Sequence, residues 1–145
     1  IAKILASEGH HIAFNGLADF EEIIAISDKL KDLGAASVHY FDADMRNGDA
    51  VREMLATAEN TMGPIDVLIN NAGIQHVSQI EKFPISRWDD VMAVNLTASF
   101  HTIAAVIDGM RARGLDASSI FLWCMTWLLL QTNPPTFPQS MVLSV

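Results

Sequence analysis

Three short apolar segments each end in residues that could bind a ligand. These residues are Asn15-Gly16, Asp44 and Asn70-Asn71-Ala72-Gly73. Amide and carboxylate groups bond hydroxyl and amino groups, and the small residues Ala72 and Gly73 let a flat ligand approach the backbone. The Asn71 side chain is also suited to tying neighbouring strands together. Each of these residues alone is typical of a turn or a helix cap, but three at corresponding strand ends favour a ligand site.

The elements that must position these residues alternate between helix and strand. Apolar residues recur at helical spacing in residues 1–8, 19–33, 49–62 and 86–110. The almost unbroken apolar segment 65–69 is typical of a parallel strand that is buried on both faces. We therefore predict an α/β fold: part of a Rossmann-type, doubly wound parallel sheet in three α/β/α layers, with a ligand at the carboxyl ends of its strands.

Four polar residues mark the starts of the predicted helices. Asp19 and Asp49 have the residue type and position of N-caps for the second and third helices. Ser86 and Asp89 have the spacing of a capping box for the fourth helix. We expect each of these helices to begin directly after its cap.

The turn from Asn70 to Gly73 after a buried strand, with Asp44 after the previous strand and Asn95 along the next helix, resembles the short-chain dehydrogenase/reductase family. The resemblance covers residues 1–114 throughout. It implies a partial NAD-binding Rossmann domain that lacks its first strand and its C-terminal half. Residues 115–145 do not follow the family pattern, and we treat them as a separate tail.

The resemblance implies a cofactor role for several residues. Asp44 would accept a hydrogen bond from the adenine amino group, with the Met45 backbone beside it. The adenosine ribose would be lined by Asn71, Ala72 and Gly73. Residues 12–27 contain no Arg or Lys to hold a 2′-phosphate, so NAD is favoured over NADP, and Asn15 is a candidate donor to the ribose.

The resemblance also implies roles in catalysis and substrate binding. Asn95 would be the helix-kinking asparagine that holds a water molecule in a proton relay, although a mid-helix asparagine bonded to its own preceding turn is the alternative. Gln75 would bond a substrate carboxylate, because residues 71–76, 83–84, 88–89 and 95–96 resemble family members that act on a small hydroxy acid. Reductases of 3-oxoacyl groups or sugars, and a non-catalytic remnant, are the alternatives.

The residues after Gly114 lack the Tyr-x-x-x-Lys segment of the family, and Tyr40 is the only tyrosine. A one-base shift of the back-translated sequence permits such a segment, so we interpret residues 115–145 as a frameshifted translation product. An authentic variant terminus is the alternative. Residues 120–130 are expected to supply a strand beside residues 65–70. The family's glycine-rich pyrophosphate turn is expected before Ile1, and the chain as written is predicted to be inactive.

Bulk properties exclude several classes of function. The 145 residues carry a formal net charge of -8, which argues against nucleic acid as a partner. The five histidines have no metal-ligand spacing, and the apolar segment 120–130 is shorter than a membrane span needs. A single cysteine, Cys124, fits a reducing cytoplasmic location. The family resemblance implies a homotetramer formed through helices that include residues 88–110.

Overall fold

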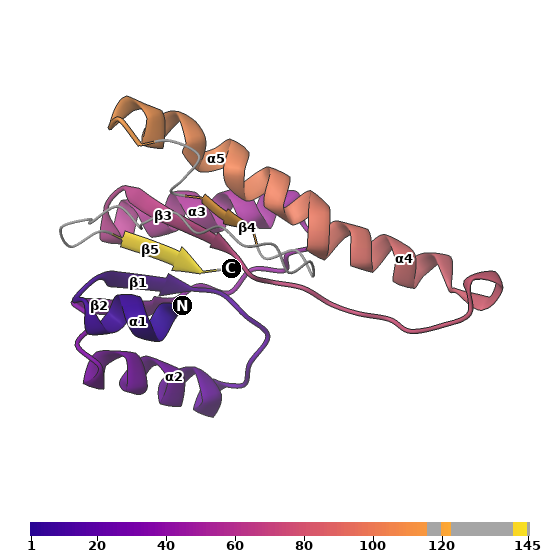
Figure 1. The fold of residues 1–145 in the computed structure, drawn as a ribbon, viewed down its shortest axis with the longest axis horizontal. Helices are drawn as coiled ribbons and strands as arrows, with labels where there is room; N and C mark the ends of the chain where they lie inside the picture. Colours follow the sequence, from indigo (N-terminus) through magenta and orange to yellow (C-terminus); the bar gives the residue numbers. More distant parts are fainter. Residues whose placement is uncertain (116–119, 123–140, 145) are drawn as a thin grey trace.

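The computed structural model describes residues 1–115, 120–122 and 141–144 (Figure 1). Within these ranges the helices and strands are α1 Ala2–Ser7, β1 His11–Phe14, α2 Phe20–Asp32, β2 Ser37–Tyr40, α3 Gly48–Met62, β3 Ile65–Asn70, α4 Ile85–Met92, α5 Ala98–Ala112, β4 Ile120–Leu122 and β5 Met141–Ser144. A 3-10 turn at Ile80–Lys82 precedes α4, and a π-helical segment at Ala93–Thr97 joins α4 to α5. Most of the predicted tail lies outside the described residues.

The strands form one parallel sheet in the order β2-β1-β5-β3-β4. The predicted strand beside residues 65–70 is confirmed for Ile120–Leu122, since Leu68 pairs with Ile120 and Asn70 with Leu122. The sequence did not reveal β5, which lies between β1 and β3 and pairs with both (Figure 1). Because every pairing is parallel, the carboxyl ends of all five strands meet at one edge of the sheet.

Helices cover both faces of this sheet, which confirms the three-layer α/β fold. Side chains of α1 and α2 pack with Ile12, Val67 and Ile69 on one face. Side chains of α3 and α5 pack with Ala13 and Leu68 on the other face. Successive side chains of a strand point to opposite faces, so β1 and β3 supply apolar residues to both cores. The prediction that β3 is buried on both faces is therefore confirmed.

The predicted helix starts are correct at one of three positions. Asp19 caps α2, and its side chain accepts from the Glu22 backbone N–H at 2.9 Å. The cap of α3 is Asn47 rather than Asp49, which lies in the first turn of that helix. Pro84 occupies the cap position of α4, so the prediction for Ser86 was wrong.

The continuous helix Ile85–Ala112 has the length and apolar character that a membrane span requires. It is the single such helix in the described part of the chain, and the criterion is one of length and composition only. A mostly buried core helix meets the same criterion; here 22% of the most apolar 18-residue stretch is buried, and Val106 and Met110 pack in the core beside α3.

Candidate functional site

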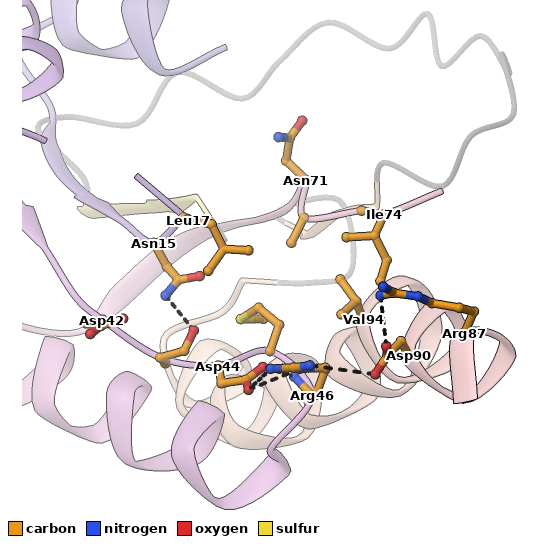
Figure 2. A pocket seen from close by; sticks show the side chains of 15 residues that line it. Asn15, Leu17, Asp42, Asp44, Arg46, Asn71, Ile74, Arg87, Asp90 and Val94 are labelled. Atoms are coloured by element: carbon orange, nitrogen blue, oxygen red, sulfur yellow. Dashed lines mark hydrogen bonds and ion pairs between the residues drawn. The ribbon is translucent and has the colours of Figure 1, made fainter. Parts of the chain in front are cut away.

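A cavity of about 610 Å³ lies at the carboxyl ends of β1, β2 and β3 (Figure 2). Its lining includes six of the predicted site residues, namely Asn15, Asp44, Met45, Asn71, Ala72 and Gly73. It also includes Gly16, Leu17, Asp42, Ala43, Arg46, Ile74, Arg87, Asp90 and Val94. The three strand ends that the sequence singled out therefore converge on one cavity. Gln75 and Asn95 do not line it.

The end of β1 is joined to the segment after β2 by the side chain of Asn15. Its Nδ2 donates to the carbonyl oxygens of Phe41 at 2.9 Å and Ala43 at 3.0 Å. Both amide protons are then used, so the prediction that Asn15 donates to a ribose was wrong, and Asn15 can offer a ligand only its Oδ1, as an acceptor. The predicted strand-tying role of Asn71 was wrong: Asn71 is exposed, and its side chain extends away from Asp44 and Arg46 (Figure 2).

The Asp44 carboxylate is held by a residue that the sequence analysis did not single out. Oδ1 accepts from the Arg46 backbone N–H and from Arg46 Nε, both at 2.9 Å, and Oδ2 accepts from Nη2 at 2.7 Å. These hydrogen bonds, with the guanidinium charge, lower the pKa of Asp44 from its ordinary 3.8 to about 2. The carboxylate is therefore ionised, and acts only as an acceptor, at any pH near neutrality.

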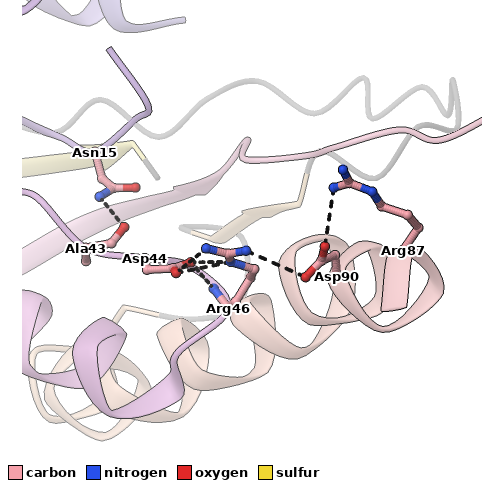
Figure 3. A network of polar contacts seen from close by, with 6 residues as sticks. All are labelled: Asn15, Ala43, Asp44, Arg46, Arg87 and Asp90. Carbon is pink, nitrogen blue, oxygen red and sulfur yellow. Dashed lines mark hydrogen bonds and ion pairs between the residues drawn. The ribbon is translucent and has the colours of Figure 1, made fainter. Parts of the chain in front are cut away.

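Two further charges continue this ion pair toward α4 (Figure 3). Arg46 Nη1 lies 3.7 Å from Asp90 Oδ1, and Arg87 Nη1 lies 3.5 Å from Asp90 Oδ2. The chain Asp44–Arg46–Asp90–Arg87 thus connects the loop after β2 with α4. We call these four residues the charged strap. The two-residue spacing of Asp44 and Arg46 was visible in the sequence, but the approach of α4 was not.

Asn95 lies in the π-helical segment and binds the loop that follows β3. Its Oδ1 accepts from the Ile74 backbone N–H at 2.9 Å, and its Nδ2 donates to the Ile74 carbonyl oxygen at 3.0 Å. The side chain therefore satisfies both backbone groups of Ile74, the residue directly after Gly73. This pairing contradicts the alternative in which Asn95 bonds its own preceding turn. Its role in a proton relay stays a prediction.

A second buried contact fixes the end of β3 to α5. Thr102 Oγ1 lies 2.5 Å from Asn70 Oδ1 and 2.9 Å from the Ser99 carbonyl oxygen. The 2.5 Å separation is in the range of an O–H···O bond and too short for N–H···O, so the Thr102 hydroxyl donates to Asn70 Oδ1. Asn70 Nδ2 is buried and has no partner among the described residues. Asn70 and Thr102 thereby anchor the strand end that precedes the cavity loop.

Gln75, the predicted substrate residue, is exposed and lies beyond Ile74 in the loop that leads to the 3-10 turn. The described residues hold no group of three or more His, Cys, Asp or Glu side chains that could bind a metal ion. The cavity is lined by asparagine amides, three aspartates, two arginines, small residues and a few apolar side chains. These groups suit a polar, partly flat organic ligand.

Residues 1–120 match the family model described as short chain dehydrogenase. D-beta-hydroxybutyrate dehydrogenase of Rhizobium meliloti (strain 1021) is 40% identical over 114 residues, which are 79% of this chain and 44% of that protein. A 3-oxoacyl-[acyl-carrier-protein] reductase of Staphylococcus epidermidis (strain ATCC 35984) is 34% identical over 110 residues, which are 76% of this chain and 45% of that protein.

Solved structures agree with these sequence matches. The crystal structure of the NADH-dependent reductase A1-R′ complexed with NAD superposes with a TM-score of 0.71 at 26% identity. The match covers 78% of this chain and 47% of that one. This chain thus spans less than half the length of the proteins it matches.

Proposed function

This chain belongs to the short-chain dehydrogenases, and from that premise we propose that it carries the adenosine-binding part of a NAD site. The parent activity would be the reversible oxidation of D-3-hydroxybutyrate to acetoacetate. The observation that carries the proposal is the convergence of Asn15, Asp44 and the Asn71–Gly73 turn on one cavity. In open parallel sheets, ligands bind in the crevice outside the carboxyl ends of the strands.

The cavity groups fit an adenosine. Asn15 Oδ1 is an acceptor for a ribose hydroxyl, and Asp44 is an acceptor for the purine amino group. Ala72 and Gly73 present little side-chain bulk, so a planar ring and its sugar can approach the backbone there. A bound nicotinamide would supply hydride transfer, and the described residues bind and orient the adenosine end.

The charges of the lining favour NAD over NADP. The lining holds three aspartates, Asp42, Asp44 and Asp90, and two arginines, Arg46 and Arg87. Each arginine is already within 4 Å of an aspartate carboxylate. A 2′-phosphate needs an unengaged Arg or Lys beside the ribose, and no such residue lines the cavity within the described chain.

The proposed substrate rests on sequence similarity to a known dehydrogenase, and not on the lining of the cavity. The relative from Rhizobium meliloti supports a short hydroxy acid as the substrate of the parent enzyme, with Gln75 bonding its carboxylate. Proton transfer to the substrate oxygen needs a tyrosine of the Tyr-x-x-x-Lys kind. Tyr40 does not fill that role, because its hydroxyl donates to the Gly16 carbonyl oxygen at 2.8 Å. We therefore expect no turnover by this chain.

The test is a calorimetric titration of the purified chain with NAD and with NADP, followed by an assay of hydroxybutyrate-dependent NADH formation. Saturable binding of NAD, weaker binding of NADP and no turnover are expected. Absence of NAD binding would refute the proposal in favour of a non-catalytic remnant. A preference for NADP would favour the second candidate, a 3-oxoacyl-carrier-protein reductase, which the relative from Staphylococcus epidermidis supports.

Self-association is also proposed, as a homotetramer formed through α4 and α5. Four large apolar side chains along α4, the π-helical segment and α5 are more than half exposed, namely Ile85 at 78%, Trp88 at 51%, Leu96 at 58% and Phe100 at 67%. Exposed apolar patches of this kind mark protein contacts. Light scattering should give four times the chain mass, and Phe100→Asp should lower it; a monomer at micromolar concentration would refute this. A cytoplasmic location is part of the same proposal.

A further inference from the structure

Arg46 lies at the cavity wall and holds the orientation of the Asp44 carboxylate. The guanidinium makes a bidentate contact through Nε and Nη2, and the Arg46 backbone N–H fixes Oδ1 from a third direction. Half of the Asp44 side chain surface is exposed, so without these bonds it would be free to rotate into solvent. A bidentate fork fixes the plane of a carboxylate as well as its position.

The hydrogen-bond inventory of Asp44 leaves one place for a ligand. An ionised carboxylate has about four lone-pair positions. Arg46 fills three of them with three protons: its backbone N–H and Nε bond Oδ1 at 2.9 Å, and Nη2 bonds Oδ2 at 2.7 Å. The single Nε proton is shared with Oδ2 at 3.1 Å, as the longer arm of a bifurcated hydrogen bond. The remaining acceptor position belongs to Oδ2. At this position Oδ2 accepts a hydrogen bond from an N–H or O–H group of a ligand and repels a carbonyl oxygen.

The second end of Arg46 is fixed by α4. Its Nη1 faces Asp90, which is the least exposed carboxylate of the charged strap at 27% and is also paired with Arg87. The guanidinium is therefore held between the loop after β2 and α4, with both of its ends engaged (Figure 3). A guanidinium held in this way keeps one geometry at a lower entropic cost than a flexible ammonium group.

We propose that Arg46 is a positioning residue that sets the selectivity of this site for a 6-amino purine over a 6-oxo purine. The inference rests on the proposed function, since it assumes that the cavity binds a purine nucleotide. The exocyclic amino group of adenine donates to the remaining position of Asp44 Oδ2. The carbonyl oxygen of hypoxanthine at the same place would face a carboxylate that has no proton to donate.

The test compares AMP with IMP, which differ in this region by an amino group against a carbonyl, in calorimetric titrations of the unmodified chain and of three variants. The unmodified chain should bind AMP about tenfold more tightly than IMP, the size of one hydrogen bond to a charged group at a partly exposed site. In Arg46→Met the ratio should fall to about twofold, chiefly through weaker AMP binding. Arg46→Lys should be intermediate, because an ammonium cannot form the bidentate contact.

Arg111→Met is the matched control. It removes an arginine of the same charge that pairs with Asp108 and does not line the cavity, so the AMP to IMP ratio should stay near tenfold. Circular dichroism should show that all variants keep the helical content of the unmodified chain. Equal affinities for AMP and IMP, or an unchanged ratio in Arg46→Met, would overturn the role of Arg46 while NAD binding still supports the proposed function. If AMP, IMP and NAD all fail to bind, both are overturned.

Discussion

Replacing Asn95 with alanine should release the loop after β3 from the helix that carries it. The substitution removes two hydrogen bonds, from the Ile74 N–H at 2.9 Å and to the Ile74 carbonyl at 3.0 Å. Each such bond contributes about 1 kcal/mol net, and Ile74 is half-buried, so water replaces the lost partners only in part. We expect Asn95→Ala to lower the free energy of unfolding by about 2 kcal/mol.

Two measurements check this value. Urea denaturation gives the change in global stability, and amide hydrogen exchange reports on the Ile74 N–H itself, whose protection should fall about thirtyfold for a loss of about 2 kcal/mol. Asn71→Ala is the matched control, because Asn71 is an exposed asparagine in the same loop and should leave Ile74 protection unchanged. Unchanged exchange at Ile74 in Asn95→Ala would refute the assigned pairing.

A charged variant tests the direction of the two bonds. In Asn95→Asp one carboxylate oxygen still accepts from the Ile74 N–H, but the other faces the Ile74 carbonyl oxygen and is repelled. Protonation restores a donor there, so the pKa of the new carboxyl should be raised in the folded state. The deficit of Asn95→Asp relative to the unmodified chain should therefore be largest at neutral pH and shrink as the pH falls.

Three further predictions follow from other contacts. The pKa of Asp44 is lowered to about 2 in the folded chain, so the stability that Asp44→Asn loses should be fully present above about pH 4 and disappear as the pH falls toward 2, in denaturant titrations across that range. Alanine favours a helix over glycine, but a Cβ at Gly48 would overlap the His101 ring. Gly48→Ala should therefore stabilise the chain, by about 0.5 kcal/mol, only when His101 is also replaced by alanine. Additive effects of the two substitutions in a double-mutant cycle would contradict this contact. Deleting residues 141–145 removes β5, which pairs at four positions with β1 and at four positions with β3. At about 1 kcal/mol per hydrogen bond the loss is about 4–8 kcal/mol, so cooperative thermal unfolding should disappear. A retained sharp transition would contradict the central place of β5.

The fold, and the three strand ends that line the cavity, were predictable from the sequence because they depend on local patterns. Alternating periodicity specified the helices and strands, and the parallel arrangement placed Asn15, Asp44 and the Asn71–Gly73 turn at the same sheet edge. Only residue types and chain order entered that reasoning. These residues line one cavity, so a strand-end argument located a cavity without knowledge of side-chain contacts.

Features that depend on distant parts of the chain were missed. Asp49 and Asn47 are both good cap residues, and Asn47 is the cap because its Oδ1 accepts from the Asp49 and Ala50 backbone N–H groups. Gly48, the first residue of α3, lies against the His101 ring of α5. Likewise, no sequence pattern indicated that Asp90 of α4 would approach Arg46. The charged strap therefore went unrecognised although each of its charges was visible, since tertiary contacts decide which charges pair.

The width of the candidate site is set by a strand from the far end of the chain. β1 and β3 do not pair with each other; both pair with β5, so their axes lie two strand spacings apart, about 10 Å. From β1 the chain turns to α2 on one face of the sheet, and from β3 it turns toward α5 on the other face. These connections diverge over the end of β5 and leave the crevice in which a ligand would lie. The family match reaches residue 120, whereas β5 begins at Met141, so the spacing between Asn15 and the Asn71–Gly73 turn depends on residues outside the family pattern.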